Sequence, residues 1–221
     1  MVDLGCGTGL STRAWAARAD EVVGVEPNVA MLERARAATR EPNVRFLEAF
    51  AADTGLTGGA ADAVCCAQAF HWMEPGPVLA EAARVLRPGG VFAAYDYDVP
   101  PVVEPAVDEA FRIHFEARRE ARRRLGLQAG ASTWPKERHL ERIRESGQFR
   151  YAREVVCHGR DWTDAEGVVG LAESIGGPRG LLAQAPEVAA TFERLRETAQ
   201  RVLGERRWPR VVCYRVRCGI V

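Results

Sequence analysis

The stretch Asp3-Leu4-Gly5-Cys6-Gly7-Thr8-Gly9 decides the fold, because it joins a short apolar start to a helical segment through three closely spaced glycines. Glycine is needed where the backbone takes a positive φ or passes close to a ligand. A helix that begins behind such a loop directs free N–H groups and a positive dipole end toward whatever the loop holds. The stretch therefore predicts a ligand site between a strand and the helix that follows it.

Two familiar glycine loops do not fit this stretch. The dinucleotide fingerprint requires a glycine three residues after its second one, and Leu10 stands at that position. A phosphate loop requires Gly-Lys-Ser/Thr, which is absent. An NAD-dependent or nucleotide-sugar enzyme on a similar sheet is therefore disfavoured. A loop with an acid and no lysine suits a zwitterionic ligand, with Asp3 paired to an ammonium and the loop amides facing a carboxylate.

Apolar runs and helical patterns alternate along the first hundred residues. After the apolar start Met1-Val2, strands are predicted at 21–25, 44–47, 62–67 and 91–95, with helices after the glycine loop, at about 29–39 and at 77–86. This alternation is typical of an α/β fold, with a doubly wound, mostly parallel sheet. Ligands of such sheets bind at the carboxyl ends of the strands.

The pattern changes beyond Pro100-Pro101. Helices are predicted at 104–124 and 136–146, a strand at 149–157, and two or three helices within 163–204. The run 210–217 alternates apolar and basic residues, which suits an edge or antiparallel final strand.

Composition excludes several classes of function. Thirty basic and thirty acidic side chains give a net charge of zero, whereas a nucleic-acid binder normally carries a basic excess. No run reaches the roughly 18 to 20 apolar residues of a membrane span, and the first residues contain no secretory signal. The cysteines follow no recognised metal spacing, so we expect no metal and reduced thiols in a cytoplasmic protein. The six cysteines are Cys6, Cys65, Cys66, Cys157, Cys213 and Cys218.

Glu26 follows the second predicted strand, 23 residues after Asp3. A carboxylate at this place can accept hydrogen bonds from both hydroxyls of a ribose, as in nucleotide sites of related layout. An exposed acid in a turn is the alternative interpretation.

These residues carry a family resemblance. The run from Asp3 to Gly9, followed by Glu26, resembles motif I and its follow-on acid in class I S-adenosylmethionine-dependent methyltransferases. The run Gln68-Ala69-Phe70-His71-Trp72 is similar to the fourth-strand motif of the type 11 branch, and Leu86–Gly90 resembles that branch's turn before strand five. The fourth-strand run is the more specific, and it is similar to the trans-aconitate-type small-molecule methyltransferases.

The resemblance implies a Rossmann-like fold with an antiparallel final strand and a helical insertion after strand five. It implies S-adenosylmethionine as cofactor. It places the three glycines at the methionyl and ribose part and Gln68 near the methionyl end. Glu26 is placed on the ribose, and Pro27 or Asn28 and the Ala51 amide are placed at the adenine. The implied cofactor-binding residues are Asp3, Gly5, Gly7, Gly9, Glu26, Pro27, Ala51 and Gln68.

The sequence departs from the family at two places. Ala52 replaces a frequent glutamate, and Phe50 stands where a small or acidic residue is common, so Phe50 either covers the adenine or belongs to the core. Only Met1 and Val2 precede Asp3, whereas the family has a longer first strand and lid helices there. We therefore expect an upstream start or a fragment, and a truncated domain that no longer works is the third option.

We expect a single methyltransferase domain over 1–221. Residues 1–99 form the cofactor-binding core, 100–148 a helical insertion or cap, and 149–221 the C-terminal strands and helices that complete the sheet. The predicted activity is methyl transfer to a small-molecule acceptor, with O-methylation favoured. The alternative is a truncated or inactive relative that binds cofactor without turnover. Methylation of nucleic acid is disfavoured, because no Asn/Asp-Pro-Pro-Tyr/Phe motif follows the fourth strand.

His71 is the first candidate for a catalytic base, because it follows the fourth strand and histidine titrates near neutral pH. A purely structural role in the turn is the competing interpretation. A carboxylate acceptor needs no base, whereas a hydroxyl acceptor benefits from one. Tyr95 to Asp98, after the fifth strand, either line the acceptor pocket or are solvated turn residues.

Overall fold

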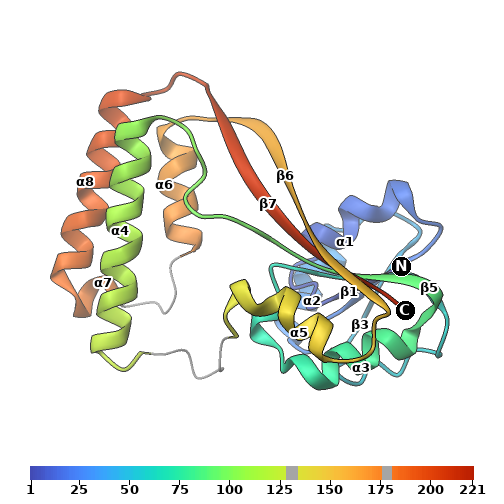
Figure 1. Ribbon diagram of the computed structural model, residues 1–221. Coiled ribbons are helices and arrows are strands. Elements are labelled where there is room, and N and C mark those ends of the chain that lie inside the picture. The colour runs from blue at the N-terminus through green and yellow to red at the C-terminus, as the bar shows by residue number, and fades with distance from the viewer. Residues whose placement is uncertain (128–133, 176–180) are drawn as a thin grey trace. The chain divides into compact units, whose positions relative to one another are not determined.

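The computed structural model describes residues 1–127, 134–175 and 181–221, which form two compact units (Figure 1). Unit 1 comprises Met1–Asp96, the described part of Thr133–Val156, and Arg215–Val221. Unit 2 comprises the described parts of Tyr97–Ser132 and Cys157–Tyr214. Each unit has its own core.

A sheet in the order β3-β2-β1-β4-β5-β7-β6 organises unit 1. Its first five strands are parallel, with registers such as Val2 opposite Val23 and Val64 opposite Phe92. The predicted mostly parallel sheet is therefore confirmed. The bounds are β1 Val2–Leu4, β2 Val22–Val25, β3 Val44–Leu47, β4 Ala61–Ala67, β5 Leu86–Tyr97, β6 Tyr151–Thr163 and β7 Trp208–Ile220.

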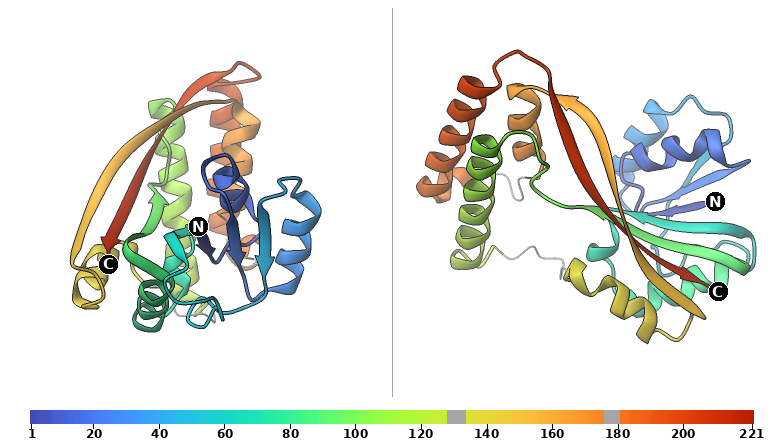
Figure 2. Two further views of the ribbon diagram at one scale, coloured as in Figure 1. Left: turned by 90° about the vertical axis from the view of Figure 1, so that its right-hand side faces the viewer. Right: turned by 45° about the horizontal axis from the view of Figure 1, so that its top comes forward.

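The strand β7 runs antiparallel to both of its neighbours, β5 and β6. Both β6 and β7 have one part in unit 1 and the other in unit 2. Gly89 N donates to Val221 O at 3.1 Å, and Val221 N donates to Gly90 O at 3.1 Å. The prediction of an antiparallel final strand is thus confirmed. Since β7 lies between β5 and β6, the two edges of the sheet are β6 and β3. The long strands β6 and β7 run side by side in both views of Figure 2.

Two helices of unit 1 begin at residues that favour a helix start. Asn28 Oδ1 accepts from Met31 N at 3.2 Å at the start of α2, and Pro75 opens α3. The elements are α1 Leu10–Trp15, η1 Ala16–Arg18, α2 Val29–Ala38, η2 Phe70–Trp72, α3 Pro75–Val85, η3 Lys136–Arg138 and α5 His139–Glu145.

Helices cover both faces of the sheet in unit 1. Val23 and Val25 of β2 belong to the same core cluster as α3 and as Ile143 of α5. Gly24 lies between them and points to the opposite face, where Phe46 fills the space above it. This alternation is the doubly wound arrangement that the sequence predicts.

β5 is longer than the predicted strand at 91–95. Ala61 pairs with Leu86, but Ala63 pairs with Val91, so the two strands lose register between these pairs. The segment Leu86–Gly90, predicted as a turn, is therefore an irregularity within β5, with Gly89 at φ 80°.

Unit 2 is helical apart from its strand ends. Its helices are α4 Pro105–Arg124, α6 Ala165–Ser174, α7 Leu181–Gln184 and α8 Pro186–Val202. Figure 1 shows α4, α6 and α8 side by side, around a core that includes Phe111 and Leu195. Buried Arg118 donates to the carbonyls of Ala172 at 2.9 Å and Ile175 at 3.2 Å, which caps the end of α6. None of the helices in the described part of the chain is both long and apolar enough to cross a membrane.

Candidate functional site

The glycine loop joins β1 to α1 and holds its glycines at positive φ. Gly5 and Gly7 have φ 69° and 54°. A Cβ on Gly5 would lie 2.5 Å from Met73 Cε, whereas a Cβ on Gly7 would meet only Met31 Sδ, at 3.8 Å. Gly5 therefore allows the loop to pack against the segment after β4, and Gly7 borders open space.

Gly9 has a different role. It is the N-cap of α1 with φ 77°, and a Cβ there would lie 2.9 Å from Phe46 Cζ and 3.1 Å from Ala35 Cβ. Gly9 thus permits close packing of the loop on β3 and α2, and it is not part of the cavity wall described below.

Asp3 lies beneath the loop with no exposed surface. Its carboxylate accepts from Thr12 Oγ1 at 2.8 Å and from Cys65 Sγ at 3.4 Å, which connects β1 to α1 and β4. Burial raises the pKa of Asp3 to about 6, against the lowering effect of these hydrogen bonds. Asp3 supports the loop from the protein interior and does not line the cavity.

Glu26 stands at the end of β2 with both carboxylate oxygens engaged. Oε2 accepts from Gly7 N at 3.0 Å, and Oε1 accepts from Asn28 N at 3.0 Å. These bonds fix the side chain between the glycine loop and the start of α2. Each oxygen keeps a further lone pair, so the carboxylate can still accept from a ligand.

A cavity of about 690 Å³ opens beside these groups, at the carboxyl ends of the parallel strands. This volume is within the usual range for small-molecule sites. Six predicted cofactor-binding residues line it, and Asp3 and Gly9 do not. The six are Gly5, Gly7, Glu26, Pro27, Ala51 and Gln68.

Phe50 also lines the cavity, and 71% of its surface is exposed. Its assignment to the core is therefore wrong, and an aromatic ring is available to a ligand at this point. A second wall of the cavity, formed after β4 and along α3, is not predicted by the sequence patterns. It includes Trp72, the last residue of the fourth-strand motif, and Met73 and Glu74, which follow directly on that motif.

His71 is not part of this cavity wall. Its side chain is 14% exposed, and its Nδ1 lies 3.8 Å from Asp96 Oδ1. Burial and the nearby Lys136 charge lower the pKa of His71 to about 4, although Asp96 acts in the opposite direction. The imidazole is therefore neutral at pH 7.

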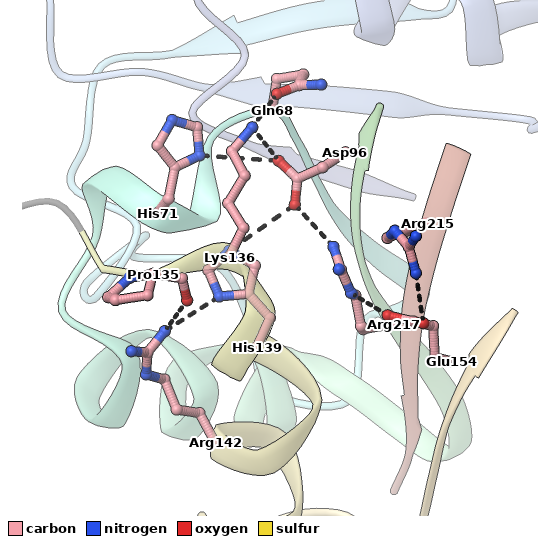
Figure 3. Close-up of polar contacts among 10 residues, drawn as sticks. All are labelled: Gln68, His71, Asp96, Pro135, Lys136, His139, Arg142, Glu154, Arg215 and Arg217. Atoms are coloured by element: carbon pink, nitrogen blue, oxygen red, sulfur yellow. Dashed lines mark hydrogen bonds and ion pairs between the residues drawn. The ribbon is translucent and has the colours of Figure 1, made fainter. Parts of the chain in front are cut away.

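A group of charged side chains surrounds Asp96, which is 4% exposed (Figure 3). Asp96 Oδ1 lies 2.9 Å from Lys136 Nζ, and Oδ2 accepts from Arg217 Nη1 at 3.2 Å. Arg217 Nε also donates to Glu154 at 2.7 Å. The burial of Asp96 contradicts its interpretation as a solvated turn residue.

Gln68 connects this group to the cavity. It is the one non-glycine residue with positive φ, 53°, in the described part of the chain. Such a conformation costs about 1–2 kcal/mol, and it is maintained only where the surroundings enforce it. Gln68 N donates to Tyr95 O at 2.9 Å, and the side-chain Oε1 accepts from Lys136 Nζ at 2.6 Å.

Residues 2–94 match a family model described as a methyltransferase domain. This segment is similar to the methyltransferase domain family. The match confirms the resemblance inferred from the glycine loop, Glu26 and the fourth-strand motif, and it covers the strands and loops that build the cavity.

Individual methyltransferases resemble the chain over the same region. An uncharacterized methyltransferase of Mycobacterium tuberculosis is 43% identical over 90 residues, 41% of this chain and 36% of that protein. The trans-aconitate 2-methyltransferase of Deinococcus radiodurans is 38% identical over 96 residues, 42% of this chain and 36% of that protein. The matches thus span about a third of the length of these curated relatives.

A solved structure shares the fold over nearly the whole chain. A protein of Anaeromyxobacter dehalogenans, provisionally named a type II methyltransferase, superposes with a TM-score of 0.63 at 25% identity, covering 99% of this chain and 88% of that one. The methyltransferase fold therefore continues past the segment that matches the family model.

Proposed function

We propose that this chain transfers a methyl group from S-adenosylmethionine to a small-molecule acceptor. The observation that carries the proposal is the Glu26 carboxylate, held by Gly7 N at 3.0 Å on the wall of the cavity. A hydrogen-bond acceptor that is held in place beside a glycine loop without lysine suits a ligand in which ribose hydroxyls lie next to a zwitterionic group.

Different residues of the cavity wall would contact different parts of the cofactor. Glu26 would accept from the ribose hydroxyls, Pro27 and Ala51 would border the adenine, and exposed Phe50 would cover it. Gly5 and Gly7, which line the cavity, would face the methionyl part together with Gln68, and Gly7 borders open space. When bound, S-adenosylmethionine supplies an electrophilic methyl group on a sulfonium.

We propose O-methylation of a carboxylic acid as the reaction. Among the described residues of the cavity wall, the titratable side chains are Glu26 and Glu74, and His71 lies outside it. A carboxylate acceptor is already ionised at pH 7, so its methylation requires alignment rather than a base. The relative named for trans-aconitate supports this acceptor class.

The test is calorimetric titration of S-adenosylmethionine and S-adenosylhomocysteine into the chain, with NAD as the comparison ligand. We expect micromolar binding of the first two and none of NAD. Transfer of radiolabelled methyl to a panel of carboxylic acids, phenols and amines then identifies the acceptor, and the methylated atom distinguishes O-, N- and C-transfer.

Two results would contradict the proposal in different ways. Absence of binding to a folded chain overturns the cofactor assignment. Binding with no turnover on any acceptor favours the alternative, a relative that retains the cofactor site without activity.

A further inference from the structure

The orientation of the Gln68 side-chain amide is fixed by chemistry. Lys136 Nζ donates to Gln68 Oε1 at 2.6 Å. An ammonium has only donors, so it can bond to the oxygen of an amide but not to its nitrogen. The –NH₂ group is therefore turned away from Lys136. Gln68 lines the cavity, and its buried Nε2 has no hydrogen-bond partner among the described residues.

Lys136 is itself held from several directions. Its ammonium lies 2.9 Å from Asp96 Oδ1, and Asp96 is anchored in turn by Arg217. The backbone around it is also fixed, because Trp134 N donates to His71 O at 2.8 Å and Arg142 donates to Pro135 O at 2.7 Å. Figure 3 shows Lys136 between Gln68 and Asp96. The side-chain amide of Gln68 is thus held by a lysine whose own position is fixed by Asp96 and by the surrounding backbone.

We propose that Lys136 is a positioning residue that makes Gln68 present an N–H donor, not a carbonyl, to a carboxylate in the cavity. A buried donor without a partner is unfavourable, so the site is completed by a ligand atom that accepts a hydrogen bond, for which a carboxylate oxygen is well suited. The inference rests on the proposed function, which offers two such groups: the methionyl carboxylate of the cofactor and the carboxylate of an acid acceptor.

The test compares two ligands that differ by this group. S-adenosylhomocysteine carries the amino-acid carboxylate, and 5′-methylthioadenosine keeps the nucleoside and thioether without it. Lys136→Met removes the donor at similar length, Lys136→Arg restores one, and Glu137→Gln changes the charge of an exposed neighbour. Each protein is titrated with each ligand.

If the carboxylate belongs to the cofactor, Lys136→Met weakens S-adenosylhomocysteine about 10-fold or more, and Lys136→Arg recovers much of the loss. Binding of 5′-methylthioadenosine is unchanged in all variants, which shows that the site is intact. Glu137→Gln binds both ligands as the wild type does.

If the carboxylate belongs to the acceptor, S-adenosylhomocysteine and 5′-methylthioadenosine bind Lys136→Met as they bind the wild type. Trans-aconitate then binds the S-adenosylhomocysteine complex of Lys136→Met about 10-fold more weakly than it binds the same complex of the wild type. Equal loss of both nucleosides, or no change in any of the three ligands, overturns the assignment. Failure of the wild type to bind S-adenosylhomocysteine would instead reject the proposed function.

Discussion

Glu26 and Gly7 are joined by a hydrogen bond of 3.0 Å from the glycine backbone to the carboxylate, across the carboxyl ends of β2 and β1. The bond ties the acid to the glycine loop, so the two parts of the candidate cofactor site have a fixed separation. The other carboxylate oxygen accepts from Asn28 N at 3.0 Å. A change at Glu26 is therefore expected to affect the two loops that surround it as well as the proposed cofactor.

Glu26→Gln is expected to weaken S-adenosylhomocysteine binding by 10- to 100-fold, about 1.5–3 kcal/mol, because hydrogen bonds to a charged acceptor are lost. The new –NH₂ group also faces one of the two backbone donors, so a stability loss of about 1 kcal/mol is expected. Calorimetry and urea unfolding measure the two effects. Glu33→Gln, on the exposed face of α2, is the matched control. Affinity within twofold of the wild type in Glu26→Gln would contradict the assignment.

Phe50→Ala should reduce cofactor affinity without affecting stability. The ring is 71% exposed on the cavity wall, so its removal changes the free energy of unfolding by less than about 0.5 kcal/mol. Loss of aromatic contact with an adenine lowers affinity by roughly 3- to 10-fold. Tyr151→Ala, which removes another exposed ring outside the cavity, should leave affinity unchanged. Normal binding by Phe50→Ala would place the adenine elsewhere.

Gly9→Ala should destabilise the fold by about 2–4 kcal/mol, because it combines an unfavourable positive φ with a Cβ 2.9 Å from the Phe46 ring. Gly59 provides the comparison. It has φ 68°, and nothing lies within 4 Å of its added Cβ, so Gly59→Ala should cost only about 1–2 kcal/mol. Urea unfolding of both variants measures the difference, and equal losses would show that close packing at Gly9 is unimportant.

The stability of Asp3→Asn relative to the wild type should increase as the pH rises. The folded pKa is about 6, above the ordinary 3.8, so the contribution of Asp3 to stability is complete below about pH 4 and is lost as the pH rises through 6. Between pH 4 and pH 8 the difference in unfolding free energy between the two proteins should change by about 2–3 kcal/mol in favour of Asp3→Asn. Exposed Asp62, whose pKa is lowered by Arg87, offers the control. Asp62→Asn should show no such trend between pH 5 and pH 8, and a flat profile for Asp3→Asn would contradict the burial argument.

The parallel sheet could be predicted because its signal is local. The strand β2 is a short run with every residue buried, and it is followed by an Asn cap and a helix with buried Leu32 and Ala35. The glycine loop and Glu26 likewise act within a few residues of their strand ends. The predicted bounds of β3 and α2 accordingly differ from the structure by no more than one residue.

Long-range relationships could not be predicted in this way. Lys136 reaches Gln68 across 68 residues of sequence, and no local pattern indicates such a contact. Asp3 precedes the loop as a cofactor ligand would, but its carboxylate is buried beneath α1 and accepts a hydrogen bond from Thr12 of that helix. The division of 1–221 into core, insertion and C-terminal part, and the cytoplasmic location, stay predictions.

The chain has a single lysine, Lys136. Selective ¹⁵N labelling of lysine would therefore give one side-chain ammonium resonance, free of overlap and without any mutation. That nucleus lies 2.6 Å from an amide oxygen of a residue on the cavity wall and 2.9 Å from a buried carboxylate. The protein thus contains its own spectroscopic reporter of ligand arrival, at a place where an attached dye would disturb the contacts it was meant to observe.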